Sequence, residues 1–392
     1  MRALRRSVRD RAVCAVLALF AALAASLARA STVVAVPEPP QVPAEAYILL
    51  DHVTGTVLAE HDADAPRPPA SLTKLMTAYL AFEAIQRGEM ALDEHVVVSK
   101  KAWRMGGSRM FIEVGNEVAV EDLLRGLIVQ SGNDAAVALA ERIAGSEEAF
   151  VALMNERAAS LGMSSTTFRN STGLPAAGHV STARDLAVLS RAILAGFPEL
   201  RPLFAETEFT YNGIRQFNRN RLLRYDESVD GLKTGYTSTA GYCVALTAER
   251  DGMRLVAVVL GAETAAKRQA AGRALLDYGF ESFETRKLFA RGEPIRAAKV
   301  WMGEVDSAPL GVAWDLHVTI PRGAYDALSA IVSFRDGLIA PLEANAEIGT
   351  LSVTLGGQLL SAVPVVVLEP VSLGDAWTRF KHMLLLRYGG DE

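Results

Sequence analysis

The sequence is poor in cysteine and carries no excess of basic residues. Cys14 and Cys243 are the only cysteines among 392 residues, and half of the chain is hydrophobic while 22% is charged. This composition excludes a disulfide-stapled mini-protein, a collagen-like chain and a disordered chain. The net charge of −5 argues against a broad nucleic-acid-binding surface, which needs a basic excess. The length predicts a large core and two domains.

Several catalytic signatures are absent as well. The six histidines form no His-Glu-x-x-His pattern and the sequence has no Gly-Lys pair, so neither a zinc site nor a Walker-type phosphate loop is indicated. No Gly-x-Ser-x-Gly turn occurs either, which excludes that form of serine nucleophile. We therefore expect a protein without metal or cofactor.

The first thirty residues differ from the rest in charge. Six arginines and one aspartate give residues 1–30 a net charge of +5, which leaves −10 for the remainder. A basic stretch, an apolar run over 12–27 and a terminal Ala-Arg-Ala are typical of a secretory signal peptide cleaved before Ser31. The alternative, an uncleaved anchor, is less favoured because the run is short for a bilayer span. Cleavage leaves Cys243 alone, so we expect an exported protein without an internal disulfide.

The mature chain is predicted to begin with a linker and a large α+β domain. Residues 31–43 contain four prolines and no periodicity, as linkers do. Residues 44–290 place helices between two groups of strands, which predicts an antiparallel sheet packed with helices. The expected hairpins cover 47–58 and 242–260, and the expected helices cover 71–87, 120–128, 135–143, 182–195 and 265–278. The helix at 182 opens with the capping-box pattern Thr182-Ala-Arg-Asp185.

A second domain with a different residue pattern follows. Residues 291–370 contain short β-branched runs separated by Gly, Pro and Asp, which predicts a small all-β domain. Its expected strands cover 298–301, 317–320, 348–355 and 363–368.

Residues 371–392 form a basic tail with helical periodicity. The predicted helix, 373–388, has an apolar face and a polar face; the apolar face holds Leu373, Trp377, Phe380, Leu384 and Tyr388, and the polar face Arg379, Lys381, His382 and Arg387. A terminal cationic amphipathic helix with aromatic residues favours the plane of a membrane interface. It is too short and too charged to span a bilayer. The alternative is a helix docked on its own domain.

Three short motifs carry the chemistry. Ser71-Leu-Thr-Lys74, Ser131-Gly-Asn133 and Lys233-Thr-Gly235 each occur once, in this order. Each alone is weak, but three unique matches on the expected elements are a strong joint signal. The set is typical of penicillin-binding proteins and class A β-lactamases.

Elementary chemistry supports this interpretation. A spacing of three on a helix puts Ser71 and Lys74 on one face. An ordinary lysine is protonated at neutral pH, whereas burial in a helix this apolar, with Lys233 nearby, lowers its pKa and makes it a plausible base. Ser131 is placed on a turn where it can relay a proton, and Asn133 can hold a substrate amide and the lysine. Lys233 and Thr234 can bind a carboxylate, and Gly235 allows a ligand close to the backbone.

At this point the chain resembles the low-molecular-mass penicillin-binding proteins, the serine D-alanyl-D-alanine carboxypeptidases of bacterial cell walls. The resemblance covers nearly the whole mature chain, including the β domain and the amphipathic tail. It is carried by the following segments: 69–77, 126–134, 173–175, 181–185, 218–220, 230–235, 310–312 and 319–323.

The resemblance implies a mechanism and a location. Ser71 would attack the carbonyl between the two terminal D-alanines of a peptidoglycan stem pentapeptide, and the backbone amides of Ser71 and Tyr236 would form the oxyanion hole. Arg268, with Lys233 and Thr234, would hold the terminal carboxylate. β-Lactams would acylate Ser71 as substrate mimics. The enzyme would act in cell-wall biogenesis and cell shape, peripherally on the periplasmic face of the inner membrane.

The sequence also departs from the family and leaves alternatives open. Many relatives carry His after Lys-Thr-Gly, where this chain has Tyr236. A class A β-lactamase would need a Glu-x-x-Leu-Asn string between Ser131 and Lys233, and none occurs. D,D-endopeptidase activity on cross-links uses the same residues. A binding or shape-determining role of the β domain, with incidental activity, is the alternative from another class; the sequence does not identify its protein partner.

Overall fold

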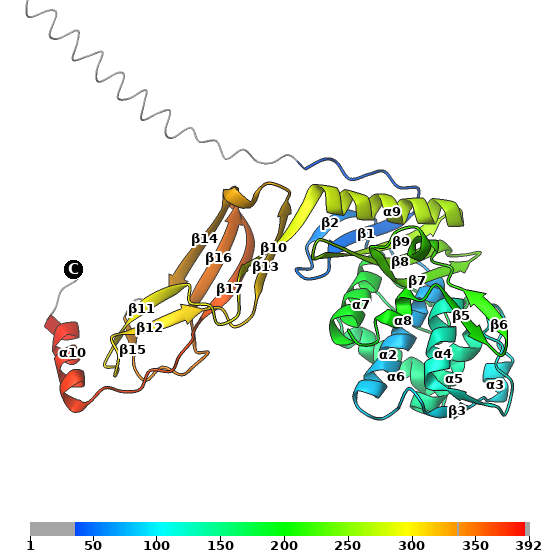
Figure 1. Cartoon of the computed structure of the whole chain (residues 1–392), viewed down its shortest axis with the longest axis horizontal. Helices are drawn as coiled ribbons and strands as arrows, with labels where there is room; N and C mark the ends of the chain where they lie inside the picture. Colours follow the sequence, from blue (N-terminus) through cyan, green and yellow to red (C-terminus); the bar gives the residue numbers. More distant parts are fainter. Residues whose placement is uncertain (1–35, 335–336, 389–392) are drawn as a thin grey trace, which may run out of the picture. The chain divides into compact units, whose positions relative to one another are not determined.

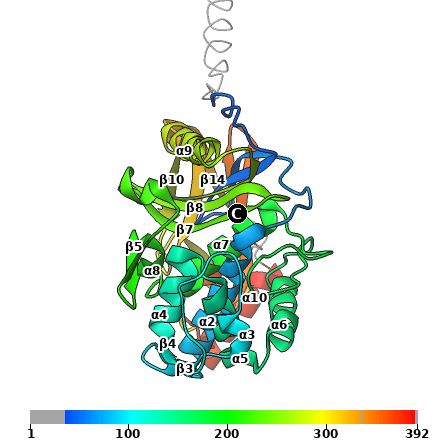
Figure 2. The ribbon, with the colours of Figure 1, turned by 90° about the vertical axis from the view of Figure 1, so that its right-hand side faces the viewer.

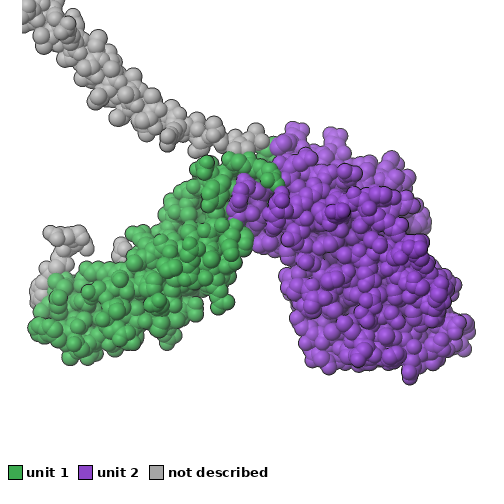
Figure 3. Space-filling view, viewed as in Figure 1, with its two compact units in different colours: residues 1–36, 287–392 green, residues 37–286 purple. Residues whose placement is uncertain are grey.

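The computed structural model describes residues 36–334 and 337–388. Their contacts divide into two compact units, one of residues 37–286 and one that contains residues 287–388 (Figure 3). The sequence placed the boundary after residue 290, whereas the division falls after Arg286, inside strand β10 (Phe283–Phe289). Because a continuous strand carries the chain from one unit to the other, no loop marks the boundary in the sequence. The predicted signal peptide lies outside the described residues.

The first unit is built on a five-stranded antiparallel sheet in the order β2-β1-β9-β8-β7. Nearly every residue of the central strand β9 is buried, as expected of a strand covered on both faces. Both predicted hairpins, 47–58 and 242–260, are confirmed. The strands are β1 (Ala46–Asp51), β2 (Val57–His61), β7 (Val229–Thr237), β8 (Gly241–Arg250) and β9 (Met253–Ala262).

Helices and two small hairpins make up the rest of this unit. The helices are η1 (Ala70–Thr73), α2 (Lys74–Gln86), α3 (Lys100–Trp103), α4 (Val120–Arg125), η2 (Gly126–Gln130), α5 (Asn133–Ala144), α6 (Glu147–Ser160), α7 (Ala183–Gly196), α8 (Pro202–Ala205), η3 (Arg221–Arg224) and α9 (Ala265–Ser282). The hairpins pair β3 (His95–Val97) with β4 (Glu117–Ala119) and β5 (Glu208–Tyr211) with β6 (Ile214–Phe217).

The helices cover both faces of the sheet. Helix α9 lies on one face, and α2, α5 and α7 lie on the other side (Figures 1 and 2). The α9 side is sealed by a cluster that includes Leu49, Leu255 and Leu275. The opposite side has a larger cluster that includes Ile48 and Phe82. Helix α2 is buried almost all round, which agrees with its lack of a polar face in the sequence.

The helix expected at 71–87 has a different start. Ala70–Thr73 form a 3₁₀ turn, and the α-helix itself begins at Lys74. Ala70 has a φ of 48°, and the amide of Leu72 donates to the carbonyl of Pro69 over 3.1 Å. This turn redirects the chain just before the helix and places Ser71 on the tight turn rather than on the first α-helical turn.

Two further expectations need correction. Helix α9 continues through Gly279 to Ser282, beyond the predicted end at residue 278. A Cβ at Gly279 would lie 2.6 Å from the Cδ1 atom of Leu255. The glycine therefore serves close packing on the sheet. At α7 the Thr182 hydroxyl caps the amide of Asp185 as predicted, but the Asp185 carboxylate accepts from Ser165 and Thr166 instead of completing the box.

The second unit is an all-β domain with a Val- and Leu-rich core. Six strands pair in the order β14-β16-β17-β12-β11-β15, and β10 pairs with β13. All four predicted strands are present. Four strands of this unit's sheets, β10, β12, β14 and β15, lie outside the predicted ranges; β12 contains a proline, β14 is mostly exposed and β15 has only two residues. The elements are β11 (Arg296–Trp301), β12 (Ser307–Gly311), β13 (Leu316–Pro321), η4 (Tyr325–Ala327), β14 (Leu328–Phe334), β15 (Leu338–Ile339), β16 (Glu347–Leu355) and β17 (Gln358–Val367).

The tail forms helix α10 (Ala376–Tyr388), which starts later than the predicted residue 373. Asp375 accepts from the amide of Thr378 over 2.7 Å, as an N-cap does, and Leu373 bridges to Gly303 instead of joining the helix. The sequence pattern predicts His382 on the polar face, but the residue is buried, and its Nδ1 accepts from the amide of Met302 over 2.8 Å. Among the described residues, no helix has both the length and the apolar character needed to cross a membrane.

Candidate active site

The side chains of Ser71 and Lys74 meet at the junction of η1 and α2. The Nζ atom of Lys74 lies 3.1 Å from the Oγ atom of Ser71, as the i, i+3 spacing predicted. Two other acceptors hold the same nitrogen, the Oδ1 atom of Asn133 at 2.7 Å and the carbonyl of Thr172 at 2.6 Å. A neutral amine has two N–H donors for these oxygens, so its lone pair is left facing the Ser71 hydroxyl.

The environment of Lys74 favours the neutral amine. Burial, followed by the positive charge of Arg219, lowers the pKa of Lys74 to about 7, against the opposing effect of Asp134. The side chain is 1% exposed, so desolvation of the ammonium is the main cause. The predicted direction is confirmed, but the neighbouring charge that matters most belongs to Arg219 rather than Lys233. The signal for Arg219 lay in the Asn218-Arg-Asn220 segment.

The Ser131–Asn133 motif lies opposite, between the π-helical turn η2 and helix α5. Ser131 adopts a left-handed conformation with a φ of 66°, and its buried hydroxyl has no hydrogen-bond partner within the described part of the chain. A strained, unpaired hydroxyl that lines the same cleft as Ser71 is available for proton transfer. The side-chain amide of Asn133 donates one N–H to the carbonyl of Gly106 over 2.6 Å. Its second N–H is left for a ligand.

Strand β7 forms the wall next to Ser71. A Cβ on Gly235 would lie 3.0 Å from the backbone nitrogen of Ser71, so glycine is needed for this approach. Thr234 is nearly buried on the same strand. The ring of Tyr236 stacks on that of Tyr242, with centroids 4.3 Å apart, because the two residues are paired across β7 and β8.

The third motif contributes a second buried lysine. Burial, with the charges of Lys74, Arg219 and Arg268, lowers the pKa of Lys233 well below its usual value. Its Nζ donates to the Thr234 carbonyl over 3.1 Å. Arg268, near the start of α9, has its guanidinium 5.8 Å from the Tyr242 ring centroid. An incoming carboxylate would restore the charge of Lys233 and complete this group.

These side chains border one cleft of about 860 Å³. All but the two lysines line it directly: Ser71, Ser131, Asn133, Thr234, Gly235, Tyr236 and Arg268. The structure therefore brings together all nine predicted site residues. The structure adds the backbone carbonyl of Thr172 to the site. Because every residue has such a carbonyl, the sequence could not single this one out.

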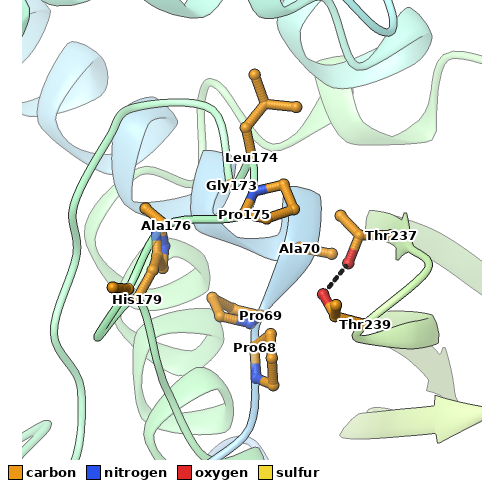
Figure 4. Close-up of a pocket in the computed structure, with 11 residues that line it drawn as sticks. Pro68, Pro69, Ala70, Gly173, Leu174, Pro175, Ala176, His179, Thr237 and Thr239 are labelled. Carbon is orange, nitrogen blue, oxygen red and sulfur yellow. Dashed lines mark hydrogen bonds between the residues drawn. The ribbon is translucent and has the colours of Figure 1, made fainter.

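A loop opposite β7 fixes the Thr172 carbonyl and the turn that carries Ser71. The Oδ1 atom of Asn170 accepts from the amides of Thr172 and Gly173, at 3.2 and 2.7 Å. Gly173 has a φ of 84°, and a Cβ there would lie 1.8 Å from the carbonyl oxygen of Ala70. Figure 4 shows Gly173 to Pro175 beside Ala70, across from Thr237, around an adjoining pocket of about 380 Å³. The loop thus braces η1 from the side.

Comparisons with known proteins agree with this site. Residues 33–264 match the family described as D-alanyl-D-alanine carboxypeptidase, and residues 283–372 match the one described as penicillin-binding protein 5, C-terminal domain. The chain is 41% identical over 362 residues to D-alanyl-D-alanine carboxypeptidase DacA of Escherichia coli strain K12, covering 90% of both chains. It is 41% identical over 359 residues to DacC of the same strain, again covering 90% of each.

Solved structures give the same result. Penicillin-binding protein 5 from Haemophilus influenzae superimposes with a TM-score of 0.82 at 37% identity, over 86% of this chain and 99% of that one. Penicillin-binding protein D2 from Listeria monocytogenes, in its ampicillin-bound form, has a TM-score of 0.58 at 36% identity, over 62% and 100%. Fold and site together define a penicillin-binding serine hydrolase.

The match extends over both units, so the class can be narrowed. The chain belongs to the D-alanyl-D-alanine carboxypeptidase family, as the three motifs predicted. Its α+β domain followed by an all-β domain is the fold of that family.

Proposed function

We propose that the protein removes the terminal D-alanine from peptidoglycan stem pentapeptides through an acyl-enzyme on Ser71. The observation that carries the proposal is the buried Lys74 amine, 3.1 Å from the Ser71 hydroxyl, with a pKa lowered to about 7. A base of this pKa is partly neutral at physiological pH and takes the hydroxyl proton as the oxygen attacks.

In the proposed acylation, the Ser71 oxygen bonds to the carbonyl carbon between the two D-alanines. The backbone amides of Ser71 and Tyr236 stabilise the negative charge that develops on the carbonyl oxygen. The C–N bond then breaks, and the proton held by Lys74 passes through the Ser131 hydroxyl to the departing amine. Water next attacks the ester and returns the proton to Ser71, which releases the shortened peptide.

Recognition of the substrate falls to the walls of the cleft. Lys233, Thr234 and Arg268 hold the carboxylate of the terminal D-alanine, and the free N–H of Asn133 holds a peptide carbonyl. Gly235 lets the turn that carries Ser71 approach β7 closely, and the peptide runs along this strand. β-Lactams, which carry a carboxylate beside a strained amide, enter the same site and acylate Ser71.

A mass measurement combined with an activity assay tests this function. Wild type is expected to release D-alanine from a pentapeptide and to gain one penicilloyl group after exposure to penicillin. Ser71→Ala is expected to do neither, and Ser160→Ala, an exposed serine at the end of α6, to do both. Absence of D-alanine release by wild type, or equal release by Ser71→Ala, would sink the proposal.

The same experiment separates the β-lactamase alternative. No acidic residue lines the cleft within the described part of the chain, so a glutamate placed to activate a deacylating water is missing there. The penicilloyl adduct should therefore persist for many minutes. Rapid turnover of penicillin would instead favour a β-lactamase.

The proposal includes a location on the periplasmic face of the inner membrane. The signal-peptide pattern of residues 1–30 supports export. Helix α10 supports peripheral attachment, because Trp377 is 72% exposed and Phe380, Met383 and Leu386 are exposed with it. Apolar side chains beside basic ones on a terminal helix are typical of interfacial binding.

Co-sedimentation with vesicles checks the attachment. The protein should pellet with vesicles containing phosphatidylglycerol, and the double substitution Trp377→Ser with Phe380→Ser should release it. Trp314→Ser removes a tryptophan that is 50% exposed in the β domain and should leave binding unchanged. Equal pelleting of all three proteins would contradict a role for α10.

A further inference from the structure

The cleft around Ser71 is lined by five arginines that form no ion pair within the described residues. No Asp or Glu belongs to its described lining, and none of its arginines forms an ion pair in the described ranges, whereas arginines elsewhere do, such as Arg184 and Arg254. The arginines of the cleft are Arg109, Arg219, Arg221, Arg224 and Arg268. They concentrate positive charge in a mature chain whose net charge is −10, so the cleft is built for an anion.

One carboxylate does not account for all five. After burial, the positive charges of Arg219 and Arg221 help to lower the pKa of Arg268. The charges of Arg219 and Arg268 contribute in the same way to the lowered pKa of Lys233. These groups surround the place proposed for the terminal carboxylate. Arg109 and Arg224 are not part of that group, and each lies instead over an exposed phenyl ring.

The two outer arginines are held by aromatic side chains. The Cζ atom of Arg224 lies 4.7 Å from the ring centroid of Phe217, and that of Arg109 lies 5.2 Å from the centroid of Phe111. A guanidinium stacked on a ring directs its N–H groups to the edge, where they can bind a carboxylate. The Nη2 atom of Arg224 also donates to the Thr207 carbonyl over 3.3 Å, which leaves its other N–H groups for such a ligand.

The walls that carry these arginines are fixed. The Asp134 carboxylate accepts from the amides of Met110 and Phe111, at 3.0 and 2.9 Å, which pins the loop next to Arg109. The Nε2 atom of Gln216 donates to the Met110 carbonyl over 3.2 Å and joins this loop to hairpin β5–β6, which ends at Phe217. Arg224 is the last residue of the turn η3 and stacks on Phe217 of this hairpin, and both Arg109 and Arg224 line the same cleft.

We propose that Arg109 and Arg224 form a second carboxylate-binding subsite that recognises a carboxylate of the stem peptide other than its C-terminal one. The inference rests on the proposed function, since it concerns the substrate of the same cleft. Stem peptides bear such a carboxylate when an acidic or diamino-acid residue is left unamidated. The enzyme should therefore prefer free-acid stems over amidated ones.

Matched synthetic pentapeptides ending in D-Ala-D-Ala test the preference. One peptide carries free carboxylates at its second and third residues, and the others carry a carboxamide at one or both. Wild type should show a kcat/KM for the free acid about five- to tenfold above that for the fully amidated peptide, mainly through KM. The two singly amidated peptides identify which carboxylate is bound. The ratio should shrink as salt is added.

Charge-removing variants assign the subsite. Arg224→Gln and Arg109→Gln should each bring the acid-to-amide ratio toward one, and the double variant should abolish it. Arg215→Gln is the matched control: Arg215 stacks at 5.0 Å on the same Phe217 ring, but it pairs with Glu208 and does not line the cleft. It should keep the wild-type ratio.

The outcomes separate the two proposals. Equal kcat/KM for acid and amide peptides in wild type, or an unchanged ratio in the double variant, overturns the second subsite while D-alanine release stands. Failure of wild type to release D-alanine from every peptide overturns the proposed function instead.

Discussion

The two units of this protein differ in what they bury. The first unit buries lysine, aspartate and arginine side chains, among them Lys74, Lys233 and Asp134, whereas the described part of the second unit buries only Thr319 and His382 among its polar residues. Burying a charged group costs free energy unless the surroundings compensate. The buried charged groups of the first unit lie around one cleft, where they are available for chemistry, whereas the described part of the second unit has an almost entirely apolar core.

The buried lysine of the first unit offers the sharpest test of this difference. We expect Lys74→Arg to lower the rate of D-alanine release by at least about a thousandfold, because an arginine stays protonated and cannot act as the base. Steady-state kinetics measure the loss, and circular dichroism melting checks the fold. Lys299→Arg, in the second unit, is the control and should leave the rate unchanged. Substantial activity in Lys74→Arg would remove Lys74 from the role of base.

The pH dependence of acylation tests the same group without substitution. Since burial lowers the pKa of Lys74 to about 7, the neutral amine dominates above that pH and declines below it. The rate of acylation by penicillin should fall about tenfold per pH unit below 7 and level off above it. Stopped-flow measurements across pH 5 to 9 reveal the profile. A flat profile between pH 5 and 7 would show that Lys74 is neutral throughout or plays no part.

The close packing of Gly173 against the turn that carries Ser71 predicts that a larger residue at position 173 destabilises the first unit. Gly173→Ala should lower the free energy of unfolding by about 2–4 kcal/mol, because the new Cβ collides with the Ala70 carbonyl and φ is positive. Gly162→Ala has a similar φ of 78° but open space around it, so its cost should be about 1 kcal/mol. Denaturant unfolding compares the two, and equal losses would contradict the proposed contact.

The smallest effect is expected in the second unit. His382→Ala removes the acceptor for the Met302 amide and should loosen α10, at a cost of about 1–2 kcal/mol. Hydrogen exchange over residues 376–388 should become faster while D-alanine release stays at the wild-type rate. Lys381→Ala, an exposed neighbour, should change neither. Unaltered exchange in His382→Ala would mean that other contacts hold the helix.

Local spacing explains what could be predicted. The pairing of Ser71 with Lys74 follows from three residues of helical geometry, and the hairpin of β8 and β9 follows from two β-branched runs around a short turn. Helix ends were less predictable, because they depend on contacts with distant residues. Gly279 packs against Leu255 of the sheet, and Leu373 bridges to Gly303 instead of joining the helix.

The family is predictable from the sequence alone, and Ser71 and Lys74 can be proposed from it as nucleophile and base, because the three motifs are unique and occur in the expected order. The surroundings of these residues follow from the fold. The Thr172 carbonyl reaches Lys74 from 98 residues away, Arg219 supplies the charge expected of Lys233, and Arg109 and Arg224 join one cleft from separate elements. Spacing along a chain fixes geometry only within a helix or hairpin, whereas burial, charge and approach between distant elements depend on how those elements pack.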